Sequence, residues 1–215
     1  MSLIFYYHPL SSYCHKALIA LYEHGVDFKA HLVDFMDEKA AAEFKALWPI
    51  RKFPVLQDEK RGVMVPESSI IIEYLDQHYS GGARLVPTEA EAALEARLMD
   101  RLFDLYVHMW MQKVMGDRLR APENRDSYGV EDAKKQLTTA YGVLDKKLAG
   151  RQWAAGNAFT IADCAAAPAL FYGAMAQPFA EEFPNLTAYF KRLKQRPSYA
   201  RVLKEAEPYF QMIPK

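Results

Sequence analysis

Residues 3–25 read LIFYYHPLSSYCHKALIALYEHG. The apolar and aromatic run over 3–7 predicts a short buried β-strand, because bulky and β-branched side chains suit a pleated surface. A histidine–proline pair then breaks the run. Ser11 or Ser12 can cap a helix that ends at Gly25, where glycine favours termination. The stretch therefore predicts a strand followed closely by a helix.

The segments up to residue 80 continue this alternation of strands and helices. Apolar periodicity and charged turns predict, in order, a strand over 28–35, a helix over 37–47, a hairpin of strands over 54–57 and 62–65, and a helix over 70–78. The first 80 residues therefore have the predicted order βαβαββα.

A turn-rich connection over 80–88 separates this unit from a second half with helical periodicity throughout. The first long helix of that half carries apolar residues every three or four positions. These residues predict a buried stripe and are Leu94, Leu98, Leu102, Leu105 and Met109.

Four more helices are expected, and the second of them is apolar enough to form the core of this half. They cover 131–148, 159–171, 186–195 and 198–205. The predicted fold class is α/β plus all-α, with a mixed domain over 1–80, a linker over 81–88 and an all-helical domain over 89–215.

Composition excludes several classes of protein. The chain has 215 residues, and 27 Lys and Arg balance 27 Asp and Glu. A neutral chain is a poor general binder of nucleic acid, because that affinity comes mainly from excess positive charge. No apolar run reaches the roughly 20 residues that span a bilayer, and no signal peptide is expected. Two cysteines, Cys14 and Cys164, make no disulfide framework and favour a reducing, cytoplasmic location.

The junction after the first strand offers a hydroxyl that can face a ligand. The first turn of a helix presents free N–H groups and the positive end of the helix dipole, which favour an anion. Ser11 and Ser12 both fall at this turn. The alternative is that one of them only caps the helix.

Two further junctions offer binding chemistry. A cis bond at Phe53-Pro54 would turn the backbone of Phe53 toward solvent, where it can pair with a peptide-like ligand. The alternative is an ordinary trans proline at a strand edge. Glu67 can hold an ammonium, and Ser68 with its N–H can hold a carboxylate. The same two residues also suit plain helix capping.

Other candidate signals are structural or weak. Thr160 and Asp163 have the spacing of a capping box, which we assign to folding rather than catalysis. His8, Cys14 and His15 lie close in sequence, but no second cluster completes a metal site, so no metal is expected. No nucleophile elbow, P-loop or dinucleotide-binding glycine pattern is present.

Taken together, these motifs resemble those of the cytosolic glutathione S-transferase family, in its serine-type, bacterial-like form. The resemblance covers essentially the whole chain. Its motifs stand in the family's order and approximate spacing: Ser11, Phe53-Pro54, Glu67-Ser68, the linker Leu85-Val-Pro87 and Thr160-Ile-Ala-Asp163. It implies a thioredoxin-like N-terminal domain, an all-helical C-terminal domain, a role in detoxification and a homodimer.

The resemblance also implies roles for individual residues. Ser11 takes the position of the hydroxyl that donates to the glutathione thiolate, and Ser12 competes for that role and joins the glutathione site. The other glutathione contacts fall on Phe53 through its backbone, a cis Pro54, Glu67 and Ser68 for the γ-glutamyl group, and Lys39 and Lys52 for the glycyl end. The hydrophobic co-substrate is expected near Leu10, Tyr106 and Trp110.

The implied mechanism follows from charge. A free thiol has a pKa of about 8.5, so it is mostly protonated at neutral pH, and the thiolate is the nucleophile. A hydroxyl donor beside a helix N-terminus favours the thiolate. The expected function is attack of this thiolate on an electrophilic carbon of a hydrophobic co-substrate, whose identity the sequence does not name.

Two alternatives remain open. Cys14 can serve glutathione-dependent reduction or dehalogenation, or the chain can be a non-catalytic glutathione-binding or regulatory protein. The segment Ser11-Ser-Tyr-Cys14 resembles a glutaredoxin Cys-Pro-Tyr-Cys that has lost its first cysteine, which argues against thiol–disulfide exchange. Phe53 stands where valine is common in the family, a change that alters packing but keeps the backbone pairing.

Overall fold

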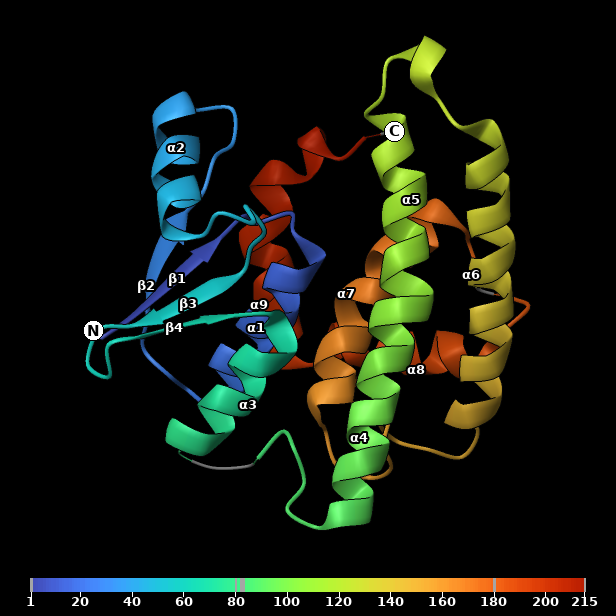
Figure 1. Ribbon diagram of the computed structural model, residues 1–215. Helices are drawn as coiled ribbons and strands as arrows, with labels where there is room; N and C mark the ends of the chain where they lie inside the picture. Colours follow the sequence, from blue (N-terminus) through green and yellow to red (C-terminus); the bar gives the residue numbers. More distant parts are fainter. Residues whose placement is uncertain (1, 80, 82–83, 180, 215) are drawn as a thin grey trace.

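The computed structural model describes residues 2–79, 81, 84–179 and 181–214, and a four-stranded mixed sheet organises its N-terminal part (Figure 1). The sheet order is β2-β1-β3-β4. β1 pairs in parallel with β2 and antiparallel with β3, which pairs antiparallel with β4. The strands are β1 (Leu3–Tyr7), β2 (Lys29–Leu32), β3 (Val55–Asp58) and β4 (Val63–Pro66).

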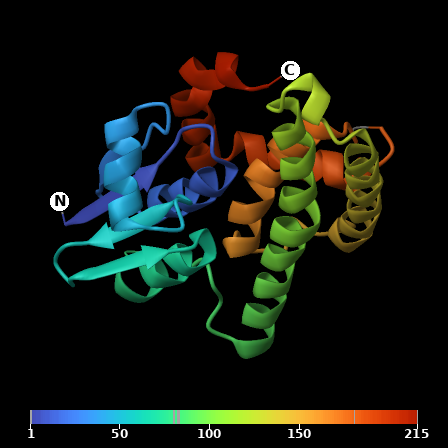
Figure 2. The same ribbon diagram turned by 45° about the horizontal axis from the view of Figure 1, so that its top comes forward.

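Three helices cover the two faces of this sheet (Figure 2). They are α1 (Ser12–Glu23), α2 (Glu38–Leu47) and α3 (Ser68–His78). α1 and α3 pack on one face through a shared apolar core, whereas Phe44 of α2 packs on the other face against Val33 and Val55. The predicted βαβαββα order and thioredoxin-like fold are confirmed.

The second half is helical, as predicted. Its segments are α4 (Ala90–Phe103), the π-helical turn η1 (Asp104–His108), α5 (Met109–Arg118), η2 (Pro122–Asn124), α6 (Ser127–Leu148), α7 (Ile161–Ala176), α8 (Pro184–Gln195), α9 (Pro197–Ala206) and η3 (Glu207–Met212). α7 lies in the middle and packs on α1, α4, α5 and α8. The capping box at its start is formed, because the Thr160 N–H donates to Asp163 Oδ2 at 2.8 Å.

The junction between the two halves is anchored by a carboxylate of α3. Asp76 accepts hydrogen bonds from the N–H groups of Leu85 and Val86, at 3.0 and 2.6 Å. The limits predicted for the two domains and for the 81–88 linker stay predictions. Residues 1, 80, 82, 83 and 215, which those limits include, lie outside the described residues.

The buried stripe predicted for the first long helix is wrong at four of its five positions, whereas Leu102 is half-buried against the core. Leu94, Leu98, Leu105 and Met109 are 62%, 45%, 42% and 52% exposed. The buried apolar residues of α4 and η1 are instead Ala93, Ala96, Met99, Phe103 and Val107. Asp100, Asp104 and His108 are buried beside them. Ala93 and Ala96 allow close approach of α7, so their face of α4 packs on the core together with Met99 and Phe103, and the other apolar residues of the stripe are left on the surface.

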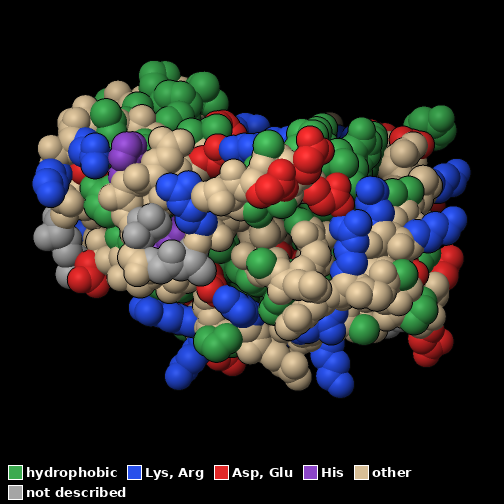
Figure 3. All heavy atoms as spheres, turned by 90° about the horizontal axis from the view of Figure 1, so that it is seen from below, with side chains coloured by type: hydrophobic (Ala, Val, Ile, Leu, Met, Phe, Trp, Pro, Cys, Tyr) green, Lys and Arg blue, Asp and Glu red, His purple; other side chains and the backbone are tan. Residues whose placement is uncertain are grey.

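The surface of the described residues carries mixed charge. On the face seen from below, Lys and Arg side chains are interspersed with Asp and Glu (Figure 3). Within the described ranges no helix is long and apolar enough to cross a membrane. The same residues form no group of three or more His, Cys, Asp or Glu side chains able to hold a metal ion.

Candidate functional site

Three junctions meet at one end of the sheet. Tyr6 of β1 pairs with Val55 of β3, and Val55 pairs with Pro66 of β4. The loop after β1, the Phe53-Pro54 bond before β3 and the start of α3 after β4 therefore lie next to one another. The sheet register thus brings together three segments that the sequence singled out separately.

Ser11 is the N-cap of α1 in extended conformation. Its Oγ accepts a hydrogen bond from the N–H of Cys14 at 3.3 Å. This contact uses an acceptor lone pair and leaves the hydroxyl hydrogen available for donation to another group. Capping the helix and donating to a ligand are therefore compatible roles for the same side chain.

His8 shapes the turn that presents Ser11, a role the sequence did not reveal. Its ring Nδ1 accepts from the N–H of Leu10 at 3.2 Å, and its carbonyl accepts from the N–H of Ser11 at 3.0 Å. Burial lowers the pKa of His8, which keeps the ring neutral near pH 7. The neutral His8 ring thus holds the turn without placing a charge beside Ser11.

A cleft of about 520 Å³ opens beside this turn, within the usual size range of small-molecule sites. Its N-terminal wall includes Leu10, Ser11, Ser12 and Phe53. The remaining lining residues come from α5 and its C-cap, from Tyr172 of α7 and from residues 212–214. Only a few polar groups interrupt an otherwise apolar lining.

The α5 wall differs from the one we expected. Met111, Met115 and Leu119 line the cleft at a spacing of one helical turn. Tyr106 is 53% exposed on another face, and neither Tyr106 nor Trp110 contributes to the lining. The expectation that a co-substrate lies near Tyr106 and Trp110 stays a prediction. Both residues lie outside the cleft lining, and the sequence could not show this, because periodicity does not say which face of a helix meets a cleft.

The Phe53-Pro54 peptide bond is cis, as proposed from the sequence. The Phe53 ring stacks on Phe35 with centroids 5.1 Å apart and lies 6.1 Å from the ring of His8. These contacts hold Phe53 at the wall of the cleft, beside Ser11.

Glu67, the N-cap of α3, has a strained backbone, and Ser68 is the first residue of the helix. Glu67 has φ 69° and ψ 118°, a left-handed value that costs energy for a residue with a Cβ. Its side chain is exposed, whereas Ser68 is only 5% exposed. Non-glycine residues held in such backbone are concentrated at ligand sites, which sets Glu67 apart from an ordinary helix cap.

Lys39 and Lys52 lie away from the walls of the cleft. Lys39 projects from α2 with a side chain that is 87% exposed and has Glu43 as a neighbour at 3.9 Å. Lys52 is exposed just before the cis bond. Neither residue lines the cleft, so contact with a bound molecule depends on how far that molecule extends toward α2.

A buried charge cluster lies behind these junctions and was not predicted. Lys16 of α1 is fully buried, and its Nζ lies 2.6 Å from Asp100 Oδ1, 2.7 Å from Asp104 Oδ2 and 2.8 Å from Ser69 Oγ. Burial favours a neutral Asp104, but the His108 hydrogen bond and the Lys16 charge lower its pKa to about 2. The one sequence feature that could have indicated this cluster is the position of Lys16 within an otherwise largely apolar helical segment.

The two cysteines are fully buried. Burial raises the pKa of the Cys14 thiol to about 12, and burial also raises the pKa of Cys164. A thiol that stays protonated and inaccessible is a poor nucleophile. This environment disfavours the reductase or dehalogenase alternative that relied on Cys14.

Two family models match the chain. The glutathione S-transferase N-terminal domain covers residues 5–83, and the C-terminal domain covers residues 104–197. Glutathione S-transferase GstB of Escherichia coli is 26% identical over 162 residues, which is 75% of this chain and 78% of the relative. The glutathione S-transferase-like protein OpS6 of Beauveria bassiana is 28% identical over 90% of this chain and 94% of its own length.

Solved structures agree with these matches. A glutathione S-transferase from Methylobacillus flagellatus with glutathione bound superposes with a TM-score of 0.84 at 25% identity, over 94% of this chain and 98% of that chain. The transferase URE2P8 from Phanerochaete chrysosporium, solved with oxidised glutathione, shares the fold with a TM-score of 0.87 at 19% identity, over 98% and 97% of the two chains.

Proposed function

The chain belongs to the cytosolic glutathione S-transferase family, and from this premise we propose that it conjugates glutathione to a hydrophobic electrophile. One observation carries the proposal. The hydroxyl of Ser11 stands at the N-terminus of α1, on the wall of an apolar cleft. This position combines a hydrogen-bond donor with the positive end of a helix dipole at the place where a thiolate needs both.

Ser11 supports the thiolate form of glutathione in this proposal. A bound sulfur within reach of the Ser11 hydroxyl receives one hydrogen bond from it and further stabilisation from the first turn of α1. The deprotonated sulfur then attacks the electrophilic carbon, and the leaving group departs with the bond's electron pair. Ser11 forms no covalent bond, so it acts as a donor and not as a nucleophile.

The neighbouring junctions support binding of the rest of the tripeptide. The backbone of Phe53, beside the cis bond, pairs with the cysteinyl unit as an added strand would. Glu67 faces the γ-glutamyl ammonium, and Ser68 faces its carboxylate. Lys39 and Lys52 are assigned to the glycyl carboxylate, which lies farthest from the cleft.

The electrophile occupies the apolar part of the cleft. Met111 and Met115 supply flexible, polarisable walls that adapt to different shapes. Such a lining favours flat or irregular apolar molecules over strongly polar ones, and it selects by size more than by functional group.

The proposal is tested by steady-state conjugation of glutathione to an aryl halide. Ser11→Ala is expected to lower kcat at least about tenfold, the equivalent of about 1.4 kcal/mol of transition-state stabilisation. Ser12→Ala is the matched control on the next residue and is expected to have a smaller effect. Retention on immobilised glutathione without turnover of any electrophile would instead indicate a binding protein.

A homodimer completes the proposal. Exposed apolar side chains continue from α4 onto neighbouring elements, where Met64 of β4 and Ile70 of α3 are 37% and 53% exposed. The Arg97–Glu73 ion pair at 2.9 Å holds α3 against α4, so these residues share one surface. A second copy related by a two-fold axis would cover this surface with the same surface of its own.

A further inference from the structure

Arg118, the last residue of α5, joins three segments that are distant in sequence. Its Nη2 donates to the carbonyl of Met175, near the end of α7, at 3.1 Å. Its Nη1 donates to the carbonyl of Pro214 at 3.3 Å and lies 3.3 Å from the sulfur of Met115. The C-terminal segment runs to this end of α5 in both ribbon views (Figure 1; Figure 2).

The segment that Arg118 holds forms part of the cleft. Met212, Ile213 and Pro214 are among its lining residues. Upstream, the segment is anchored by the ring of Phe210 against Phe171, with centroids 5.7 Å apart, and by the ring of Tyr209 against His8, with centroids 6.2 Å apart. Residues 212–214, which we call the tail, therefore lie between these two ring contacts upstream and Arg118.

The contacts of Arg118 exceed those of an arginine that only ends a helix. A basic residue in the last turn normally interacts with the free carbonyls of its own helix. Here both hydrogen bonds go to carbonyls of other segments, Met175 and Pro214. The planar guanidinium has separate donors for both at once, which a lysine cannot reproduce in the same geometry.

We propose that Arg118 is a positioning residue that holds the tail as the outer wall of the electrophile cleft and so sets how tightly apolar co-substrates are bound. The inference rests on the proposed transferase function. Release of the tail removes Ile213 and Pro214 from the lining and leaves that side open to water. Affinity for the electrophile then falls, while the glutathione contacts at the other wall remain.

The kinetic test compares Arg118→Met with Arg120→Met. Arg120 is a neighbouring arginine with a side chain 48% exposed and Asp117 at 3.6 Å, outside the cleft. Arg118→Met is expected to raise KM for an apolar aryl halide about tenfold, equivalent to about 1.4 kcal/mol, with KM for glutathione unchanged. An equal KM for the aryl halide in wild type and Arg118→Met would overturn the proposal. A rise in KM for glutathione together with KM for the aryl halide would also overturn it.

A second measurement does not depend on activity. Ile213→Cys places a thiol in the tail, and the two native cysteines are buried. We expect a thiol reagent to modify this cysteine about tenfold faster when Arg118→Met is also present than in Ile213→Cys alone, because loss of Arg118 makes the released tail the main form. An unchanged labelling rate would refute the positioning role of Arg118 even if the chain conjugates nothing. Failure of this inference and failure of the proposed function are therefore distinguishable.

Removal of residues 212–215 provides the final check. The truncated chain is expected to match the raised KM of Arg118→Met, and adding Arg118→Met to it should change nothing more. A further rise in the double variant would show that Arg118 acts on the cleft by another route and would contradict the proposal.

Discussion

Lys16 Nζ lies 2.7 Å from Asp104 Oδ2, although 88 residues separate them in the sequence. Both side chains are buried, and they belong to α1 of the first half and η1 of the second. Arg101 reaches the same Asp104 oxygen from the surface at 2.6 Å. The two halves of the chain are therefore joined by paired charge as well as by apolar contact.

Loss of the Lys16 charge should destabilise the fold. Lys16→Met leaves Asp100 and Asp104 buried without their buried cation, with the half-exposed Arg101, Ser69 and His108 as remaining partners. Removal of one partner of a buried pair typically costs about 3–5 kcal/mol. The measurement is urea unfolding at neutral pH. Lys146→Met, at an exposed lysine of α6, is the control and should stay within about 0.5 kcal/mol of wild type. Equal stability of the two variants would contradict the structural role of this cluster.

His15 should make stability fall in mild acid. It is fully buried, and burial lowers its pKa to about 4. The unfolded state binds the proton near the ordinary histidine value of about 6.5, so the folded state loses up to about 3 kcal/mol as the pH falls from there to about 4. Above that window the residue has no effect on the pH dependence.

Urea midpoints measured across this pH window test the effect of His15. His15→Gln, which keeps a donor toward the Pro9 carbonyl, should flatten the slope, and His78→Gln at an exposed histidine should not. Identical slopes in wild type and His15→Gln would show that burial of His15 is not what couples stability to pH.

The exposed stripe on α4 should control the oligomeric state. Leu98→Glu places a charge in the proposed interface and is expected to give the mass of a single chain by light scattering. Val143→Glu is a matched control, because Val143 is 47% exposed on α6 and Leu98 is 45% exposed on α4. A dimer that survives Leu98→Glu would place the interface elsewhere.

Cys14 should be dispensable for conjugation. Cys14→Ala removes one buried sulfur and is expected to cost about 1 kcal/mol of stability through the small cavity it leaves, while kcat for an aryl halide stays within about twofold of wild type. A collapse of the rate, with the fold intact by circular dichroism, would return the reductase or dehalogenase reading to consideration.

The features predicted correctly from the sequence are local ones. A cap such as Ser11, a capping box at Thr160 and a proline before a strand are each specified by a few adjacent residues. The strand and helix order of the first half follows from the same short-range rules. The resemblance to a known family then placed these features around one ligand.

The features that were missed depend on distant partners. The apolar stripe of Leu94 and Leu98 satisfies helical periodicity, but periodicity does not say which apolar face meets α7 and which remains exposed. Lys16 gave no sign of its two carboxylates, because they lie in the other half of the chain. The tail lines the cleft and contacts Arg118, which belongs to a segment that no local sequence pattern connects to the tail.

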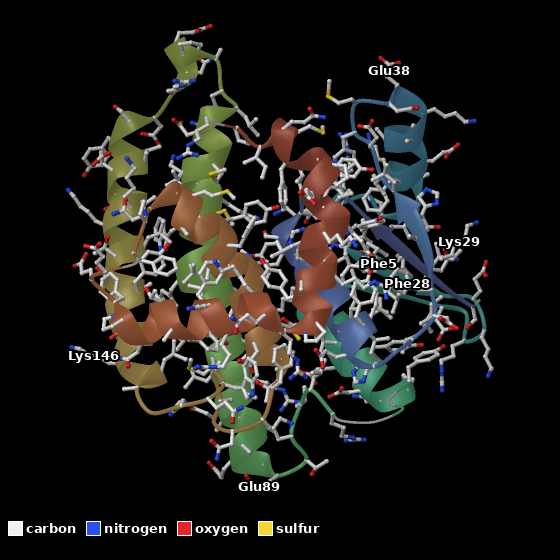
Figure 4. All side chains as sticks on the ribbon, turned by 180° about the vertical axis from the view of Figure 1, so that it is seen from behind. Phe5, Phe28, Lys29, Glu38, Glu89 and Lys146 are labelled. Carbon is white, nitrogen blue, oxygen red and sulfur yellow. The ribbon has the colours of Figure 1, made fainter. Side chains whose placement is uncertain are left out.

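The position of Phe28 also differs from the one that the sequence predicted. Seen from behind, Phe28 lies against Phe5 of β1 with ring centroids 5.8 Å apart (Figure 4). The sequence included Phe28 in a strand over 28–35, whereas β2 covers only Lys29–Leu32 and is exposed along its length. Phe28 belongs to the loop before β2, and its ring packs on the core although the strand itself is exposed.

The most direct test of the central claim is the absorbance of the thiolate of bound glutathione, titrated against pH. In the wild-type protein we expect the thiol pKa to lie below its free value of about 8.5, and in Ser11→Ala to rise by at least about one unit. Ser11→Thr, which keeps the hydroxyl, should restore most of the difference. An identical titration in wild type and Ser11→Ala would contradict the account and move the role to Ser12 or to the backbone of α1.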